Sequence, residues 1–191
     1  QDFGNETIFK SLNKKRSDKF TYFKKIVNLL IKIQSIKHRT IKNFKNYKYT
    51  IPNYDKKILI SEASLFCDWY AKKWSSKSIQ KNFSKEFIKI IKNLVSKIKL
   101  KNNVFVHRDF HVSNLMLVNG QIGVIDSQDA LIGNKAYDLA SLVDDVRLKT
   151  SKSLKKKVFN YYLRKQKKLN LNKFKNDFEI LSILRNLKII G

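Results

Sequence analysis

The stretch 104–126 constrains the fold of this 191-residue chain more than any other part of the sequence. It contains three apolar runs of strand length, at 104–106, 115–118 and 122–125. Asn119 and Gly120 separate the last two runs, and this dipeptide favours a two-residue type I′ turn that pairs the strands on either side. The third run leads directly into Asp126. The sequence therefore predicts a strand, a polar loop and a β-hairpin that ends at an acidic residue.

The polar loop carries His107, Arg108, Asp109 and Asn114 at the spacing H-R-D-x-x-x-x-N. This spacing is typical of the catalytic loop of protein-kinase-like phosphotransferases. Phosphoryl transfer needs a carboxylate that orients the attacking hydroxyl and metal ions that neutralise the phosphate oxygens, and Mg²⁺ prefers oxygen ligands. We expect Asp109 to be the catalytic base. The predicted hairpin brings Asn114 close to Asp126, and we expect this pair to hold Mg²⁺. His107 is expected to support the loop, and Arg108 either supports it or contacts phosphate.

Length and composition set the broad class. A chain of 191 residues is long enough for one domain with a sizeable core. It contains no apolar run of about 18 residues, so we expect no transmembrane helix and no membrane partner. No secretory signal opens the sequence. The single cysteine, Cys67, cannot form an internal disulfide, which fits a reducing compartment. We therefore expect a cytoplasmic protein, and a monomer.

The net charge of +26 suggests a nucleic-acid partner at first sight. The excess is mostly Lys rather than Arg, however, and the lysines are spread over every segment. Lys, Asn and Ile are abundant while the chain has one Pro and five Gly, which indicates a compositional bias. We therefore expect solvated lysine-rich faces and no specific nucleic-acid partner, although such a charge attracts anions such as nucleotides.

Helical periodicity dominates outside the strands, so the predicted fold class is α+β and mainly helical. The stretch 36–55 holds the only proline and is expected to be a loop. Helices are expected after a cap at Ser17 or Asp18, from Ser61 or Glu62, after a cap at Ser78, and near 136–149, 153–168 and 173–190.

Between Val106 and Arg147 the sequence resembles the aminoglycoside phosphotransferase and choline-kinase-like family. The resemblance is sharpest to its bacterial branch of anomeric kinases for N-acetylmuramate and N-acetylglucosamine. It is carried by HRDFH at 107–111, NLM at 114–116, GVID at 123–126, QDA at 128–130, Gly133 and AYDLASL at 136–142. The resemblance implies a protein-kinase-like fold, ATP and Mg²⁺ as cofactors, and an amino sugar as the small-molecule acceptor. Ser127 departs from the aromatic residue that the family usually has after its metal-binding Asp.

The resemblance also implies roles for residues outside the loop. Asp138 is expected to support the catalytic loop. The segment around Asp2 and Phe3 looks like the hinge that follows the nucleotide-binding lobe, so these two residues are candidates for nucleotide contacts. Contacts to the acceptor sugar are expected among Glu62, Asp68, Asp129, Asp145 and Arg147, each of which could instead have a surface or capping role.

One part of the family pattern is missing. The chain has no G-x-G-x-x-G loop and no V-A-I-K-like strand lysine upstream of residue 107, although both are needed to hold ATP phosphates. We therefore expect residues 1–191 to be the C-terminal lobe of a kinase-like phosphotransferase, with 1–5 as a hinge remnant, the N-terminal lobe absent and the C-terminus truncated. Such a fragment alone is expected to be inactive. The alternatives are a kinase for an aminoglycoside, choline or similar small alcohol, and a non-catalytic basic binding module.

Overall fold

The computed structural model describes residues 3–13, 18–42, 44–74, 76–146 and 148–191. Its α-helices are α1 (Ile8–Leu12), α2 (Lys19–Gln34), α3 (Lys56–Leu65), α4 (Lys72–Trp74), α5 (Lys77–Ser96), α6 (Tyr137–Val143), α7 (Lys152–Arg164) and α8 (Leu171–Ile190). A π-helical segment, Phe66–Ala71, joins α3 to α4, and a 3₁₀ turn, Val112–Asn114, precedes β4. The described part of the chain is thus mainly helical with short strands, the α+β class that the sequence predicted.

The strands form three antiparallel pairs. They are β1 (Thr40–Lys42) with β2 (Lys48–Thr50), β3 (Asn102–Val106) with β6 (Leu131–Asn134), and β4 (Leu115–Val118) with β5 (Gln121–Val124). The β4–β5 turn has positive φ at both Asn119 (48°) and Gly120 (75°), as a type I′ turn requires. The predicted hairpin is therefore confirmed in register and in turn type.

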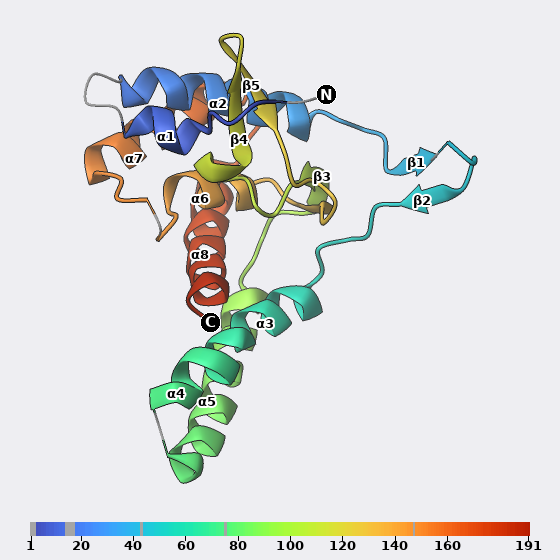
Figure 1. The fold of residues 1–191 in the computed structure, drawn as a ribbon. Coiled ribbons are helices and arrows are strands. Elements are labelled where there is room, and N and C mark those ends of the chain that lie inside the picture. Colours follow the sequence, from blue (N-terminus) through green and yellow to red (C-terminus); the bar gives the residue numbers. More distant parts are fainter. Residues whose placement is uncertain (1–2, 14–17, 43, 75, 147) are drawn as a thin grey trace.

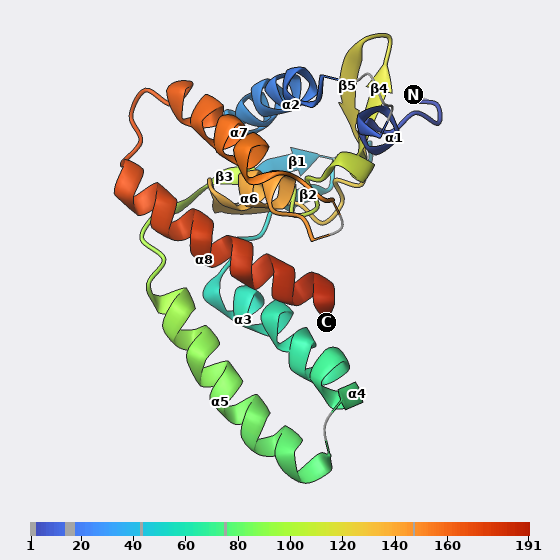
Figure 2. The same cartoon turned by 90° about the vertical axis from the view of Figure 1, so that its left-hand side faces the viewer.

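Helices pack against one another and against the strands β3, β4 and β5. Figure 2 shows α7 lying beside α2, while α8 passes between α6 and α3. Every residue of α6 is buried, so this short helix occupies the centre of the core. The largest fully buried side chains include Phe23 of α2, Phe110 after β3, Tyr162 of α7 and Phe174 of α8. The core therefore joins segments from both ends of the chain around α6.

Two projections extend from this body (Figure 1). The helices α3, α4 and α5 form an arm at the lower end of the view, and the β1–β2 hairpin extends to the right. None of the described helices has the run of apolar residues that a membrane-spanning helix requires. The end of α8 lies beside the end of α3, since a β-carbon on Gly191 would come within 2.3 Å of the Leu65 backbone. The arm is therefore anchored to the core through α8.

Several local predictions need correction. The stretch 36–55 is not only loop, because Thr40 pairs with Thr50 and Lys42 with Lys48 in the β1–β2 hairpin. All six residues of these strands are exposed, so no hydrophobic alternation marked them in the sequence. The next helix begins at Lys56, because Asp55 accepts a hydrogen bond from the Ile58 N–H (2.9 Å) and caps it.

The helix boundaries elsewhere depend on capping contacts. Asp18 caps α2, as predicted. The N-cap of α5 is Ser76 and not Ser78. The helix near 136–149 ends at Val143, because Asp144 leaves the helix to pair with Lys155 and to accept a hydrogen bond from Ser182. The β6 strand and α1 were not predicted, since both are very short.

Candidate functional site

Loop 107–114 connects β3 to β4 and is held in one tight conformation. The Asp109 carbonyl accepts a hydrogen bond from the His111 N–H (3.0 Å), and the His111 carbonyl accepts one from the Asn114 N–H (2.9 Å). Phe110 and Val112 point into the core and are fully or almost fully buried. These two apolar side chains anchor the loop. Asp109, which directly precedes Phe110, stays half-buried at the surface.

The β4–β5 register places Asn114 beside Asp126. Leu115 pairs with Val124 at the base of the hairpin, and the Ile125 N–H donates to the Asn114 carbonyl (3.1 Å). The Asn114 side-chain amide donates to the Asp109 carbonyl (3.1 Å) and to Oδ2 of Asp126 (3.4 Å). These contacts join the three residues that the motif singled out, and the amide oxygen of Asn114 receives no hydrogen bond from the described residues.

Two residues of the site have a backbone conformation that L-residues rarely adopt. Arg108 has a φ of 74° and Asp126 a φ of 66°, both in the left-handed region, where a side chain costs energy. Such residues occur preferentially at functional sites, where the surrounding structure holds them. Arg108 directly precedes Asp109 in the loop, and Asp126 follows strand β5 of the β4–β5 hairpin.

The side chain of Asp138 on α6 stabilises the backbone at His107 and Arg108. Its Oδ2 accepts a hydrogen bond from the His107 N–H (2.8 Å) and its Oδ1 one from the Arg108 N–H (3.1 Å). The side chain is fully buried, and this burial raises the pKa of Asp138 to about 7, although the two N–H donors favour the charged form. A single carboxyl group of α6 therefore fixes the two residues that precede Asp109.

His107 links the loop to the hairpin. Its Nε2–H donates to the Ile125 carbonyl (3.0 Å), one residue before Asp126. Burial lowers the pKa of His107, and the carbonyl contact and the nearby acids oppose that shift only in part. The ring is therefore neutral near pH 7, with its proton on Nε2.

Arg108 belongs to a half-buried polar network with α3 and α8. Its guanidinium pairs with Glu62, which also accepts a hydrogen bond from the Tyr54 hydroxyl and lies 3.4 Å from Lys188. Burial alone would lower the pKa of Arg108, but the contact with Glu62 raises it. Nη1 of Arg108 donates to the Asp129 carbonyl (3.2 Å). Arg108 thus ties loop 107–114 to the arm and to the last turn of α8.

The remaining candidates are dispersed. Asp68 is exposed on the π-helical segment, and Asp129 is exposed after β5. Asp145 is buried and lies 3.5 Å from Arg185. Phe3 packs on β5, where a β-carbon on Gly123 would come within 3.1 Å of its ring. Asp2 and Arg147 lie outside the described residues.

Two buried polar residues that support the start of α6, Asp177 and Asn134, were missed by sequence reasoning. Asp177 of α8 is fully buried and accepts hydrogen bonds from the Lys99 and Leu100 N–H groups (2.8 and 2.7 Å) and from the Asn134 amide (2.8 Å). Oδ1 of Asn134 in turn accepts from the Ala136 N–H (2.9 Å), at the start of α6. In the sequence Asp177 stands in the middle of a helical pattern like any surface acid, so only its partners distinguish it.

The donor set suits a hard divalent cation. Among the described residues, no group of three or more His, Cys, Asp or Glu side chains is placed to hold a metal. Asn114 and Asp126 instead offer one amide and one carboxylate, and Mg²⁺ is commonly bound by one or two protein oxygens together with water and substrate phosphates. The residues present therefore fit a nucleotide-dependent Mg²⁺ site.

Bacterial kinases have sequences similar to that of this chain. The chain is 31% identical over 147 residues to an N-acetylmuramate/N-acetylglucosamine kinase of Neisseria meningitidis, covering 74% of the chain and 44% of that protein. It is 27% identical over 196 aligned positions to the protein of the same name from Pseudomonas aeruginosa, covering 100% of the chain and 55% of that protein. The chain thus spans about half the length of the curated relatives it matches.

Solved structures share the fold. An aminoglycoside-3′-phosphotransferase of type VIII superposes with a TM-score of 0.60 at 12% identity, over 100% of this chain and 67% of that one. An ethanolamine kinase of Plasmodium vivax superposes with a TM-score of 0.59 at 19% identity, over 88% of this chain and 52% of that one. The model of the phosphotransferase enzyme family matches residues 15–171, which include loop 107–114 and the β4–β5 hairpin. The chain therefore belongs to the phosphotransferase enzyme family, whose members include aminoglycoside phosphotransferases.

Proposed function

We propose that the chain is the C-terminal lobe of an ATP-dependent small-molecule kinase that transfers the γ-phosphoryl group to a hydroxyl of an amino sugar. The observation that carries this proposal is the convergence of Asp109, Asn114 and Asp126 at the base of the β4–β5 hairpin. The family membership and the coverage of about half of each curated relative support it.

Each of the three residues has one proposed role. Asp109 orients the acceptor hydroxyl and takes its proton. Its side chain is half-buried at the surface of the loop, and Asp138 fixes the backbone just before it. Asn114 and Asp126 provide oxygen ligands for Mg²⁺. The metal, when bound, neutralises charge on the phosphate oxygens. In this proposal His107, Arg108 and Asp138 keep the loop in place and do not touch the reacting atoms.

The acceptor is proposed from the relatives. The curated relatives are named N-acetylmuramate/N-acetylglucosamine kinases, which supports an amino sugar. Among the acidic candidates for acceptor contacts, Glu62 is the one joined to loop 107–114 by an ion pair with Arg108. We propose that Glu62 borders the acceptor site and that Asp68, Asp129, Asp145 and Arg147 have lesser roles in it.

Nucleotide contacts are proposed at the start of the chain. The segment before α1 runs beside the hairpin, because the Leu117 N–H donates to the Glu6 carbonyl (2.8 Å) and Thr7 bridges to Met116. Phe3 lies on Gly123 of the same hairpin. A hinge in this place would hold the adenine end of ATP beside the hairpin and direct the phosphates towards the two metal ligands at the base of the hairpin.

The test is a phosphotransfer assay on the chain joined to a nucleotide lobe, such as that of the Neisseria relative. N-acetylmuramate, N-acetylglucosamine, choline and an aminoglycoside serve as acceptors. Asp109→Asn should lower kcat on the preferred acceptor by roughly a hundredfold or more. Glu86→Gln, at an exposed position of α5, is the matched control and should leave kcat unchanged. Equal turnover by the wild type and Asp109→Asn would overturn the proposal, and phosphorylation of choline or the aminoglycoside alone would overturn the amino-sugar assignment.

A further inference from the structure

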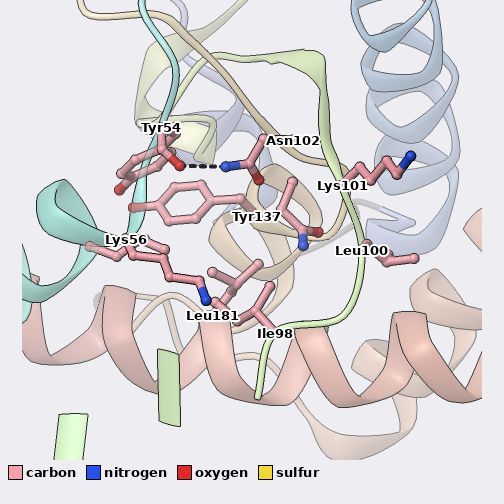
Figure 3. A pocket seen from close by; sticks show the side chains of 10 residues that line it. Tyr54, Lys56, Ile98, Leu100, Lys101, Asn102, Tyr137 and Leu181 are labelled. Atoms are coloured by element: carbon pink, nitrogen blue, oxygen red, sulfur yellow. Dashed lines mark hydrogen bonds between the residues drawn. The ribbon is translucent and has the colours of Figure 1, made fainter. Parts of the chain in front are cut away.

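A cavity of about 240 Å³ lies between α3, β3, α6 and α8, and none of the three proposed catalytic and metal-binding residues lines it. Figure 3 shows that Tyr54 and Tyr137 close one side of it, with Leu181 of α8 beneath them. Its volume corresponds to about eight water-sized groups, at a volume of about 30 Å³ each. It therefore has room for a small organic molecule.

The lining indicates which chemistry the cavity would accept. Its apolar surface comes from Leu59, Ile98, Leu100 and Leu181. Lys56 supplies a cation, while the described residues that line the cavity include no Asp or Glu. In Figure 3 the Lys56 side chain extends along the cavity with its amine towards Leu181. This combination favours a molecule with an apolar body and one negative charge.

Two packed tyrosine rings close one end of the cavity. Tyr137 is only 1% exposed. The Tyr54 ring packs edge-on against the Tyr137 ring with centroids 4.8 Å apart. The two rings therefore add to the apolar part of the lining.

The two tyrosines that line the cavity, Tyr54 and Tyr137, are linked to loop 107–114 through Glu62 and Asp138. The Tyr54 hydroxyl donates to Glu62, which pairs with Arg108, and the Tyr54 ring lies 5.7 Å from the Arg108 guanidinium. Tyr137 precedes Asp138, whose carboxyl group accepts the hydrogen bonds of the His107 and Arg108 N–H groups. A ligand that moves either tyrosine would therefore change the position of the loop.

We propose that this cavity is a regulatory site that binds a small organic anion with an apolar body and transmits its occupancy to loop 107–114 through Tyr54 and Tyr137. The proposal goes beyond phosphotransfer, because it depends on no residue assigned to the metal or to proton transfer. It also makes the two neighbouring lysines of α3 unequal: Lys56 lines the cavity and Lys57 does not.

Titration of the full 191-residue chain with hexanoate, and with its neutral analogue hexanamide, tests the proposal by two-dimensional ¹H–¹⁵N NMR. Lys56→Glu and the matched control Lys57→Glu carry the same charge change in the first turn of α3, where an acid favours the helix dipole. Both variants should therefore fold.

Hexanoate should bind the wild type and Lys57→Glu alike, and Lys56→Glu about tenfold more weakly. Hexanamide should bind the wild type more weakly than hexanoate does. The His107 and Arg108 amide signals should shift as the wild type is saturated. Equal hexanoate affinity in the two variants, or no binding to the wild type, would overturn the assigned site. Binding that leaves both amide signals unmoved would overturn its link to the loop. Neither result depends on ATP, Mg²⁺ or an acceptor, so they are distinct from a failure of the phosphotransfer proposal.

Discussion

The buried carboxyl group of Asp138 makes the stability of the fold depend on pH in an unusual direction. Burial raises the pKa of Asp138 from 3.8 to about 7 in the folded chain. Between these two values the folded chain holds a proton that the unfolded chain has released. The contribution of Asp138 to the free energy of unfolding should therefore be most favourable below pH 4 and should fall as the pH rises towards 7.

The magnitude follows from the size of the shift. A displacement of about three pH units, at about 1.36 kcal/mol each, corresponds to about 4 kcal/mol at most. Asp138→Asn removes the titration. It also replaces one acceptor oxygen with an N–H₂ group that faces a backbone N–H, which should cost about 1–3 kcal/mol. At low pH the variant should thus be less stable than the wild type, and this difference should shrink and then reverse as the pH rises towards about 7.5.

Urea unfolding followed by circular dichroism at several pH values measures this difference. Other titrating groups, such as His107 and Asp144, are present in both proteins and cancel to a first approximation. We expect the stability difference to shrink by up to about 4 kcal/mol between about pH 4.5 and about pH 7.5. A constant difference, or one that grows with pH, would refute the reasoning. It would mean that the two N–H donors outweigh burial and keep Asp138 ionised.

Three further predictions concern the metal, the polar network and the core. Asp126→Asn should weaken the binding of Mn²⁺ by about tenfold. Mn²⁺ serves as a spectroscopic substitute for Mg²⁺, and electron paramagnetic resonance measures its binding. Unchanged binding would remove Asp126 from the metal site. Glu62→Gln should lower the unfolding free energy by about 2 kcal/mol, because it leaves the half-buried Arg108 guanidinium without its acid, and urea unfolding within a few tenths of the wild type would contradict this. Gly133→Ala would place a β-carbon 2.9 Å from Cγ2 of Val106 and should destabilise the β3–β6 pair by about 1–3 kcal/mol; a thermal midpoint equal to that of the wild type would show that the pair can relax.

The contacts around α6 explain how the site is joined to the rest of the fold. Asp177 of α8 holds the Asn134 amide, and Asn134 holds the Ala136 N–H at the start of α6. Asp138 follows on α6 and holds loop 107–114. The hydrogen bonds made by the Asn134 amide, the Ala136 N–H and the His107 N–H join buried groups, and such bonds are costly to leave unmade. Changes in α8 should therefore be felt in the loop, although α8 supplies none of the three proposed catalytic and metal-binding residues.

The fold class and the local site geometry could be predicted from the sequence. The α2 cap at Asp18 and the type I′ turn at Asn119 and Gly120 depend on residues a few positions apart, whose side-chain preferences are strong. The β1–β2 hairpin was missed because its strands are exposed on every residue. The start of the arm was misplaced because the pattern around Ser61 obscured the cap at Asp55. Short exposed elements leave no hydrophobic period to read.

The sequence by itself determined the placement of Asn114 beside Asp126, because a two-residue turn and strand pairing act over only twelve positions. Only the tertiary structure decided the rest of the site. The partner of Arg108 lies 46 residues away at Glu62, and the carboxyl group that supports the loop lies 31 residues after His107. The cavity beside Tyr54 and Tyr137 likewise joins segments from five elements, α3, β3, β6, α6 and α8. Such contacts depend on how helices pack around α6, and the packing follows from the buried volume of the whole core and not from any local pattern.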